Sequence, residues 1–278
     1  MDVVQLSDPT EFLERAGPLL LADEARHNLI LGLAGTLRDH PALYPEHVQW
    51  IVEADGTVAG AALRTPPHNL VLARGSAEAL EALARSIEEL PGVVGAVPEV
   101  EQFVAAWTAL RDVRAEARLR QGIYALETVI QPSAPPGRPR LAMARDRPLL
   151  VDWWGAFAVE ALGALELDEE GAGRNVDHRL STPGNGIALW EAAGEPVSAV
   201  GFGSPTPSGV RIGPVFTPPE HRGRGYASAL TAHVSAEQLA SGRSFCFLYT
   251  DLANPTSNKI YVAIGYERVC DAIQYAFD

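Results

Sequence analysis

The chain has 278 residues, of which 47% are apolar, so it is long enough to bury the cores of one large domain or two ordinary ones. Its 22 basic and 35 acidic residues give a formal net charge of −13. Such an acidic balance argues against nucleic acid and acidic membranes as partners. An anionic cofactor would therefore have to be held by local basic groups.

The N-terminal residues MDVVQLSDPTEF contain no basic region followed by an apolar run. No stretch of the chain approaches the ~20 apolar residues that are needed to span a bilayer. The two cysteines, Cys246 and Cys270, lie in segments expected to be buried strands, and so low a count fits a reducing compartment. We therefore expect a cytoplasmic protein in which both cysteines are small core residues.

The first half of the chain alternates between strand and helix signals. After a short strand at 3–6, Asp8 and Pro9 predict a helix start, and helical spacing continues with interruptions to about residue 37. We expect His27 and Asn28 to lie on the surface of this helical region. The later elements expected in this half are a hairpin over 47–65 turning at Asp55-Gly56, a strand over 69–75, a helix over 76–90 that Ser76 caps, a strand over 92–97, a helix over 99–110 and two strands within 113–130.

Residues 131–140, QPSAPPGRPR, form a Pro-rich linker that can be neither helix nor central strand, and we place a domain boundary there. The same element order then returns, which predicts two tandem α/β domains over 1–130 and 141–278. The elements expected in the second domain are a strand over 141–144, helices over 147–162 and about 168–180, a hairpin over 186–203 turning at Ala193-Gly194, a strand over 210–216, a helix from Gly225, a strand over 245–250, a helix from Pro255 and a final pair of strands.

Residues 215–231, VFTPPEHRGRGYASALT, are the stretch around which the second domain is organised. They begin as a strand, and Gly223 and Gly225 then permit backbone conformations that side chains would block. The helix that follows leaves unpaired N–H groups at its positive end, beside Arg222 and Arg224. This combination predicts a site for a phosphorylated cofactor. No Gly-Lys-(Ser/Thr) follows the glycines, so the loop is not that of a nucleotide kinase.

A second motif lies downstream, in FCFLYTDLANPTSNKIYVAIGYERV. Asn254 is a good N-cap with Pro255 at the first helical position, and Gly265 ends the helix. Ser257 and Tyr261 are four residues apart and therefore share one face of that helix. Taken alone, these residues describe a capped helix whose tyrosine packs in the core.

The run Arg222-Gly223-Arg224-Gly225-Tyr226-Ala227 matches the (Gln/Arg)-x-x-Gly-x-(Gly/Ala) pyrophosphate motif of the GNAT superfamily of acyl-CoA N-acyltransferases. The second motif resembles that family's next strand and its Asn...Tyr helix. The resemblance implies an α/β fold of two tandem GNAT-like domains, each with a mixed, mostly antiparallel central sheet flanked by helices. It also implies acetyl-CoA as co-substrate, no metal, and transfer of the acetyl group to a primary amine of a small molecule or peptide.

The resemblance implies roles for single residues as well. Tyr261 lies where the family places the general acid that protonates the thiolate of coenzyme A. By position, the backbone of the fourth strand, which diverges from the fifth in the family, pairs with the pantetheine arm, and the loop takes the pyrophosphate. The cofactor-binding residues so implied are Val215, Phe216, Thr217, Arg222, Gly223, Arg224, Gly225, Tyr226, Ala227, Asn254 and Ser257.

The general base is left open. Many family members carry a glutamate on the fourth strand, but this chain has Arg211 in that region and no acidic residue. Glu160, Glu191 and Asp251 are candidates, and so is a water chain to backbone carbonyls. Lys259, the only lysine, is either incidental or faces a phosphate. The acceptor class therefore stays open.

The first half lacks the phosphate loop, because Val71–Ala77 has one arginine and one glycine but no second glycine. We expect this half to be a degenerate copy of the fold, so that one cofactor binds per chain. The alternative function for the chain is a non-catalytic module that binds acyl-CoA as a sensor or interaction partner. A purely structural role conflicts with the intact loop at 222–227.

Overall fold

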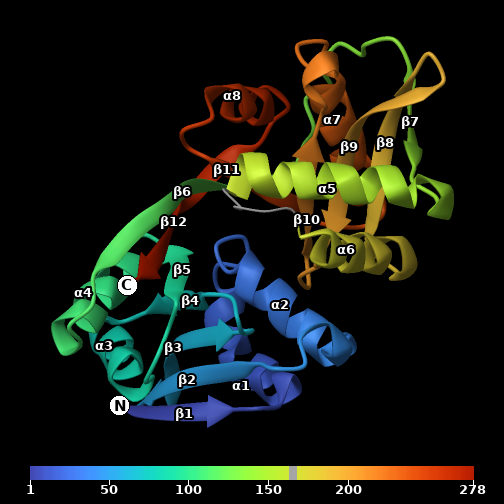
Figure 1. The fold of residues 1–278 in the computed structure, drawn as a ribbon. Coiled ribbons are helices and arrows are strands. Elements are labelled where there is room, and N and C mark those ends of the chain that lie inside the picture. The colour runs from blue at the N-terminus through green and yellow to red at the C-terminus, as the bar shows by residue number, and fades with distance from the viewer. Residues whose placement is uncertain (163–167) are drawn as a thin grey trace. The chain divides into compact units, whose positions relative to one another are not determined.

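The computed structural model describes residues 1–162 and 168–278 of the chain. They fold into two compact units (Figure 1). The first comprises Met1–Ile123 together with Val269–Asp278, and the second comprises Tyr124–Arg268. Two strands, β6 (Ala115–Leu126) and β12 (Glu267–Phe277), carry the chain from one unit to the other. Within the described residues, no helix combines the length and the apolar character that crossing a membrane requires.

The first unit is a mixed sheet covered by helices on both faces. Its strand order is β1-β2-β3-β4-β5-β12, in which only β4 and β5 pair in parallel and the other neighbours are antiparallel. The strands are β1 (Asp2–Leu6), β2 (Val48–Ala54), β3 (Thr57–Arg64), β4 (Leu70–Gly75) and β5 (Gly92–Ala96). The helices are α1 (Pro9–Leu21), α2 (Asn28–Asp39), the short 3-10 helix η1 (Pro41–Leu43), α3 (Ala77–Ser86) and α4 (Glu99–Leu110).

Neighbouring residues of this sheet point into different cores, as the period of two in a strand requires. Ile51 of β2 and Val71 of β4 pack against α1 and α2. Val52 and Leu72, one position along, pack against α3 and α4 on the opposite face. The strands are therefore apolar on both sides.

The second unit repeats this architecture. Its strand order is β11-β10-β9-β8-β7, with β10 and β11 parallel and the other neighbours antiparallel. The core under α5 and α6 includes Leu189 and Ala199, and that under α7 includes Val200 and Leu248. The strands are β7 (Arg138–Leu141), β8 (Gly186–Ala192), β9 (Glu195–Gly203), β10 (Gly209–Phe216) and β11 (Phe245–Asp251). The helices are η2 (Ala144–Asp146), α5 (Arg147–Leu162), α6 (Glu169–Ser181), η3 (Pro219–His221), α7 (Tyr226–Ala240) and α8 (Pro255–Ala263).

The two units thus share one order of strands and helices, and the fold class predicted from the sequence is confirmed. The predicted helix starts are also present. Asp8 Oδ1 accepts a hydrogen bond of 2.8 Å from the N–H of Thr10, and Ser76 Oγ accepts one of 3.2 Å from the N–H of Ala79. Residues 54–57 and 192–195 form the two expected hairpin turns. Local signals of this kind depend on residues a few positions apart.

Several sequence expectations are wrong. Residues 113–130 contain one long strand, β6, in place of two. The expected final pair of strands is also a single strand, β12, and its end runs antiparallel to β5 of the first unit, with Ala272 opposite Ala96. The helix expected to reach residue 90 ends at Ser86, where Arg111 donates to the carbonyl oxygens of Ala84 and Ile87.

His27 and Asn28 are buried, contrary to the expectation that they lie on a helix surface. Their polar groups are satisfied by nearby backbone, since His27 Nδ1 lies 2.9 Å from the carbonyl oxygen of Leu20 and Asn28 Nδ2 donates to that of Ala25. The Pro-rich stretch 131–140 ends in β7, at the edge of its sheet, where Pro139 lies opposite Trp190. An edge strand tolerates proline because one side of it needs no ladder hydrogen bonds.

Candidate functional site

In the second unit, β10 and β11 diverge after a short paired segment. They pair in parallel only over Gly209–Arg211, although β10 continues to Phe216 and β11 to Asp251. A register shift between Ile212 and Val215 bends β10 at the same place. On the side toward β11, the end of β10 therefore has no strand partner among the described residues. Its backbone N–H and C=O groups are suited to an extended ligand arm.

The side chains at the end of β10 are held in place by packing. Val215 packs against the core under α7, and the Phe216 ring lies 5.9 Å from the ring of Trp153 on α5. Thr217 Oγ1 lies 2.8 Å from Ser198 Oγ. A ligand would therefore meet a fixed backbone at these three residues, which the sequence had singled out.

The turn after β10 leaves the N-terminus of α7 open. Gly225 is the N-cap with φ 82°, no side chain caps this end, and the first turn holds no acidic residue. Gly223 also has a positive φ, of 73°. A Cβ atom at either glycine would have no described neighbour within 4 Å. Free N–H groups at the positive end of a helix, with open space before them, fit a phosphate.

The basic side chains of the turn are exposed. Arg222 donates from Nε to the carbonyl oxygen of Thr217 at 2.8 Å and from Nη2 to Glu160 Oε2 at 2.6 Å. Arg224 is exposed, whereas Tyr226 is buried in the core under α7. The loop therefore presents two guanidinium groups, one of them oriented by a carboxylate from α5.

The second motif forms α8 as predicted. Asn254 Oδ1 accepts a hydrogen bond of 3.1 Å from the N–H of Ser257, so the side chain of Asn254 caps the helix. Tyr261 packs in the core under α7 and is 8% exposed. No hydrogen bond to its hydroxyl is present in the described part of the chain. Burial raises the pKa of Tyr261 to about 12, so the phenol is protonated at neutral pH and can act as a proton donor.

A buried polar pair supports the ring of Tyr261. The rings of Tyr261 and Tyr266 meet edge to face with centroids 6.0 Å apart. The Tyr266 hydroxyl lies 2.9 Å from Ser235 Oγ on α7. Sequence reasoning missed this pair, because Ser235 and Tyr266 are separated by 31 positions and neither belongs to a motif.

The cysteines are not activated thiolates. Burial raises the pKa of Cys246 to about 12 and that of Cys270 to about 11. Cys246 is fully buried and its thiol donates to the carbonyl oxygen of Ser235. These are the properties of core cysteines, because a nucleophilic cysteine has a lowered pKa and an accessible sulfur.

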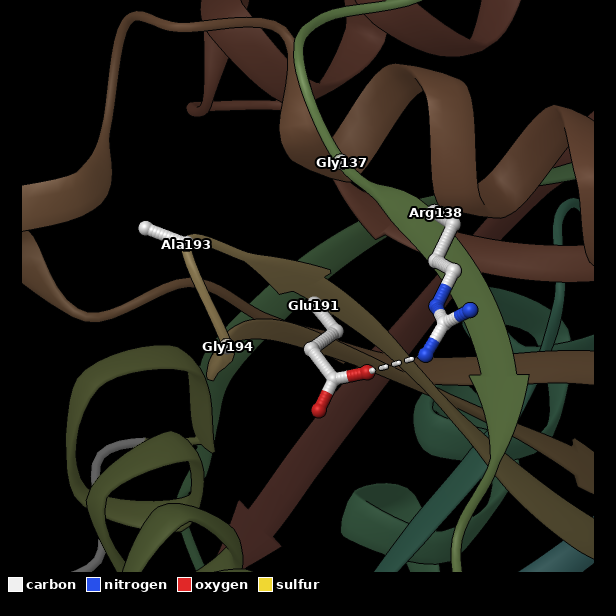
Figure 2. Close-up of a pocket in the computed structure, with 5 residues that line it drawn as sticks. All are labelled: Gly137, Arg138, Glu191, Ala193 and Gly194. Carbon is white, nitrogen blue, oxygen red and sulfur yellow. Dashed lines mark ion pairs between the residues drawn. The ribbon is translucent and has the colours of Figure 1, made fainter.

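The three candidate bases lie in different surroundings. Glu160 is engaged by Arg222. Glu191 lies 3.6 Å from Arg138 and lines a surface hollow of about 410 Å³ beside the β8–β9 turn (Figure 2). Asp251 ends β11, where its Oδ1 accepts a hydrogen bond from the N–H of Ala253. Asp251 is thus the one candidate of the three that belongs to a diverging strand.

The corresponding turn of the first unit is closed by the chain's own atoms. Ser76 caps α3, and Glu78 places a carboxylate in its first turn. The pKa of Glu78 is lowered by a hydrogen bond from its own backbone N–H and by one from the Ser76 hydroxyl. A Cβ atom at Gly75 would lie 3.0 Å from Leu80 Cδ2. This helix end is therefore capped by the chain's own groups, and the carboxylate of Glu78 would repel a phosphate.

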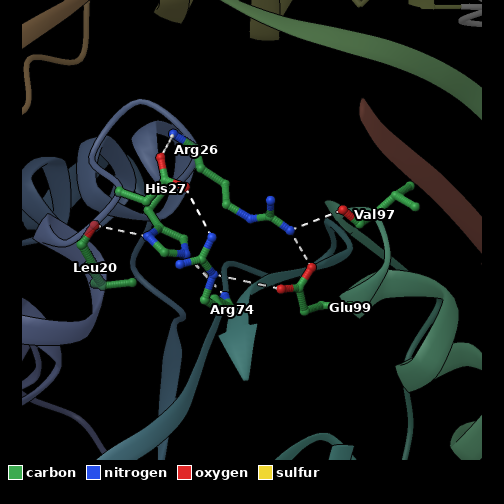
Figure 3. A network of polar contacts seen from close by, with 7 residues as sticks. Leu20, Arg26, His27, Arg74, Val97 and Glu99 are labelled. Atoms are coloured by element: carbon green, nitrogen blue, oxygen red, sulfur yellow. Dashed lines mark hydrogen bonds and ion pairs between the residues drawn. The ribbon is translucent and has the colours of Figure 1, made fainter. Parts of the chain in front are cut away.

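Side chains also join the ends of β4 and β5 in the first unit (Figure 3). Arg74 at the end of β4 pairs with Glu99 at 3.8 Å, and Arg26 donates to Glu99 and to the carbonyl oxygen of Val97. His27 Nε2 accepts a hydrogen bond from the N–H of Arg74 at 3.1 Å. A network of ion pairs therefore occupies the region that corresponds to the diverging strands of the second unit.

Among the described residues, no group of three or more histidine, cysteine, aspartate or glutamate side chains has an arrangement that could hold a metal ion. The residue types that do converge on the end of β10 are glycines and arginines, which suit an anionic ligand.

The model of the FR47-like protein family matches residues 195–275, which include both sequence motifs, the loop at 222–227 and the stretch over 245–269. Comparison with curated proteins gives no match. Solved structures with similar folds include a GNAT-family acetyltransferase from Colwellia psychrerythraea, at 14% identity over 100% of both chains with a TM-score of 0.61. A Drosophila protein is 14% identical over 99% of this chain and 98% of its own, with a TM-score of 0.69.

A tandem GNAT protein from the clavulanic acid biosynthesis pathway is similar over 100% of this chain and 98% of its own, with 14% identity and a TM-score of 0.58. This likeness covers both units, and it agrees with their shared element order. The fold that the two sequence motifs imply is therefore confirmed: the chain has the tandem GNAT fold.

Proposed function

We propose that the second unit is an N-acetyltransferase that transfers an acetyl group directly from acetyl-CoA to a primary amine. The observation that carries this proposal is the uncapped, acid-free N-terminus of α7, with its two open glycines, at the end of a strand that diverges from β11. Such a place suits a ligand with a pyrophosphate at one end and an extended arm at the other.

The residues that would hold acetyl-CoA follow from this arrangement. Backbone N–H groups from Gly223 to Ala227 would bind the pyrophosphate together with Arg222 and Arg224, and the backbone of Val215–Thr217 would pair with the pantetheine arm. Asn254 and Ser257 lie at the start of α8, next in sequence to the end of β11. When bound, acetyl-CoA supplies an activated thioester.

Tyr261 would donate the proton that the departing thiolate needs. Its pKa of about 12 keeps the hydroxyl protonated over the whole working range of pH. The amine must be neutral when it attacks the thioester, so either Asp251 or a water chain would first remove the proton of its ammonium form. The acceptor is a small-molecule or peptide amine, and the reaction would take place in the cytoplasm. A metal ion and an acyl-enzyme have no part in this proposal.

A second candidate function is a module that binds acyl-CoA without turnover. The burial of Tyr261 favours it, because a tyrosine that is 8% exposed and packed among apolar residues resembles an ordinary core residue. In that case the unit would act as a sensor or as an interaction partner.

The release of free thiol from acetyl-CoA tests the proposal. A panel of primary amines is incubated with the protein and acetyl-CoA, and the expected result is release that depends on one class of amine. Calorimetry with coenzyme A is measured on the same preparation. Binding without release for any amine would favour the non-catalytic module, and the absence of binding would reject both functions.

A further inference from the structure

Arg222 has a carboxylate partner from outside its own loop. Its Nη2 donates to Glu160 Oε2 at 2.6 Å, and Glu160 belongs to α5, 62 positions earlier in the sequence. The Nε of Arg222 also donates to the carbonyl oxygen of Thr217. Two bonds in different directions therefore orient the guanidinium group.

The position of Glu160 is coupled to the end of β10. The helix that carries it, α5, also places the Trp153 ring 5.9 Å from the ring of Phe216. Trp153 and Glu160 are seven positions apart, which is two helical turns, so they lie on the same side of α5. The carboxylate is thus held beside the loop by a packed helix.

A carboxylate and a phosphate compete for the same donors of an arginine, because both accept parallel N–H bonds from the planar guanidinium. A carboxylate that stayed nearby would also repel the phosphate. We propose that Glu160 is an intramolecular competitor for the cofactor pyrophosphate at Arg222, and that it sets the cofactor affinity below what the loop alone would give. This inference rests on the proposed function of the second unit.

The pair is weak enough to be displaced. The side chains of Arg222 and Glu160 are 43% and 55% exposed, and ion pairs with this exposure contribute little in water. A contribution of this size corresponds to about a two- to fivefold change in a binding constant. Glu160 therefore adjusts cofactor affinity without blocking the site.

The test compares Glu160→Gln with Asp152→Asn. Asp152 is exposed on the same helix, and its substitution removes the same charge without touching the Arg222 pair. Binding of coenzyme A and of pantetheine, which lacks the pyrophosphate, is measured by calorimetry. We expect Glu160→Gln to bind coenzyme A about two- to fivefold more tightly than wild type, Asp152→Asn to bind it nearly as wild type does, and neither change to alter pantetheine binding.

Three results would overturn the inference. Unchanged or weaker binding of coenzyme A by Glu160→Gln would mean that the carboxylate orients Arg222 for the ligand. An equal gain of coenzyme A affinity in Asp152→Asn would mean that the overall charge of α5, and not the Glu160–Arg222 pair, causes the effect. An equal gain with pantetheine would place the effect away from the pyrophosphate. Wild-type protein that binds no coenzyme A would reject the proposed function itself, which is a different outcome from these three.

Discussion

In both units a helix follows the fourth strand, but the N-terminus of that helix is satisfied differently in each. In the first unit Ser76 caps α3 and Glu78 places a negative charge in its first turn. Arg74 forms ion pairs with Asp23 and Glu99. In the second unit α7 begins at Gly225 with no cap and no acid, and neither Gly223 nor Gly225 has a neighbour that a side chain would meet. The chain's own side chains cap the N-terminus of α3, whereas no side chain of the described residues caps the N-terminus of α7.

Under the proposed function, this difference explains how a repeated fold can bind a cofactor in one of its two copies. The N–H groups at a helix start must be satisfied by side chains, water or a ligand. Where the chain supplies its own hydroxyl and carboxylate, the helix needs nothing further, and a phosphate would meet repulsion. The strand order and both covering layers are unaffected, because they depend on apolar residues elsewhere.

The largest expected effect comes from removing residues 269–278, which belong to the first unit. Ile273 is buried in that unit's core, and the Phe277 ring stacks on Trp107 with centroids 5.4 Å apart. Their loss, together with the pairing of β12 to β5, is expected to cost roughly 5 kcal/mol or more and to unfold the first unit. Hydrogen exchange measures this, with removal of Asp278 alone as the control. Retained protection of β2 and β5 would contradict it.

Tyr261→Phe is expected to lower kcat by about 10² to 10⁴ and to leave coenzyme A affinity nearly unchanged, because it removes only the proton donor. The control is Tyr266→Phe, which deletes the neighbouring buried hydroxyl. It is expected to lower stability by about 0.5–1.5 kcal/mol while turnover per folded molecule stays near wild type. Steady-state kinetics and thermal melting on one preparation decide the matter. Full activity of Tyr261→Phe would remove Tyr261 from the mechanism.

Calorimetric titration should saturate at one coenzyme A per chain. Arg222→Ala is expected to weaken binding by about 1.5–3 kcal/mol, since it removes a charge-assisted contact. Arg74→Ala makes the same change in the first unit and should leave the affinity unchanged. Two bound equivalents, or equal effects of the two substitutions, would show that the units do not differ in cofactor binding.

Ala227→Glu copies into α7 the acidic first turn of α3, because Ala227 and Glu78 both stand two residues after the N-cap. The helix should gain about 0.3–1 kcal/mol from its dipole, whereas coenzyme A affinity should fall about tenfold through repulsion. Thermal melting measures the expected gain in stability, and calorimetry measures the expected loss of coenzyme A affinity. Ala227→Gln is the neutral control, and an equal loss of affinity in that variant would indicate crowding as the cause.

The smallest effect concerns pH and His27, which is 3% exposed. Burial lowers its pKa, although Leu20 O and Asp23 favour the proton and Arg26 and Arg74 oppose it. The unfolded chain therefore binds the proton more readily, so stability should be constant above about pH 6.5 and decline as the pH falls below it. Urea unfolding at several pH values measures the slope. His27→Gln should flatten it, and an unaltered slope would contradict the prediction.

The sequence by itself determined the features that depend on near neighbours. Asp8, Ser76 and Asn254 were predicted as helix caps, and each accepts a hydrogen bond from an N–H two or three positions away. Gly223 and Gly225 indicated a backbone that other residues rarely adopt, and both have a positive φ angle, because this preference belongs to the single residue. The repeated order of strands and helices could also be predicted, because the spacing of apolar residues differs between a strand and a helix.

Only the tertiary structure decided what lies beyond that range. The chain's last strand completes the first unit, since an apolar strand pattern states that a segment is buried but not which sheet edge it joins. His27 is buried because Leu20 O and the N–H of Arg74 satisfy both ring nitrogens. Glu160 reaches Arg222 across 62 positions. Contacts between distant segments depend on how the layers pack, which no local pattern encodes.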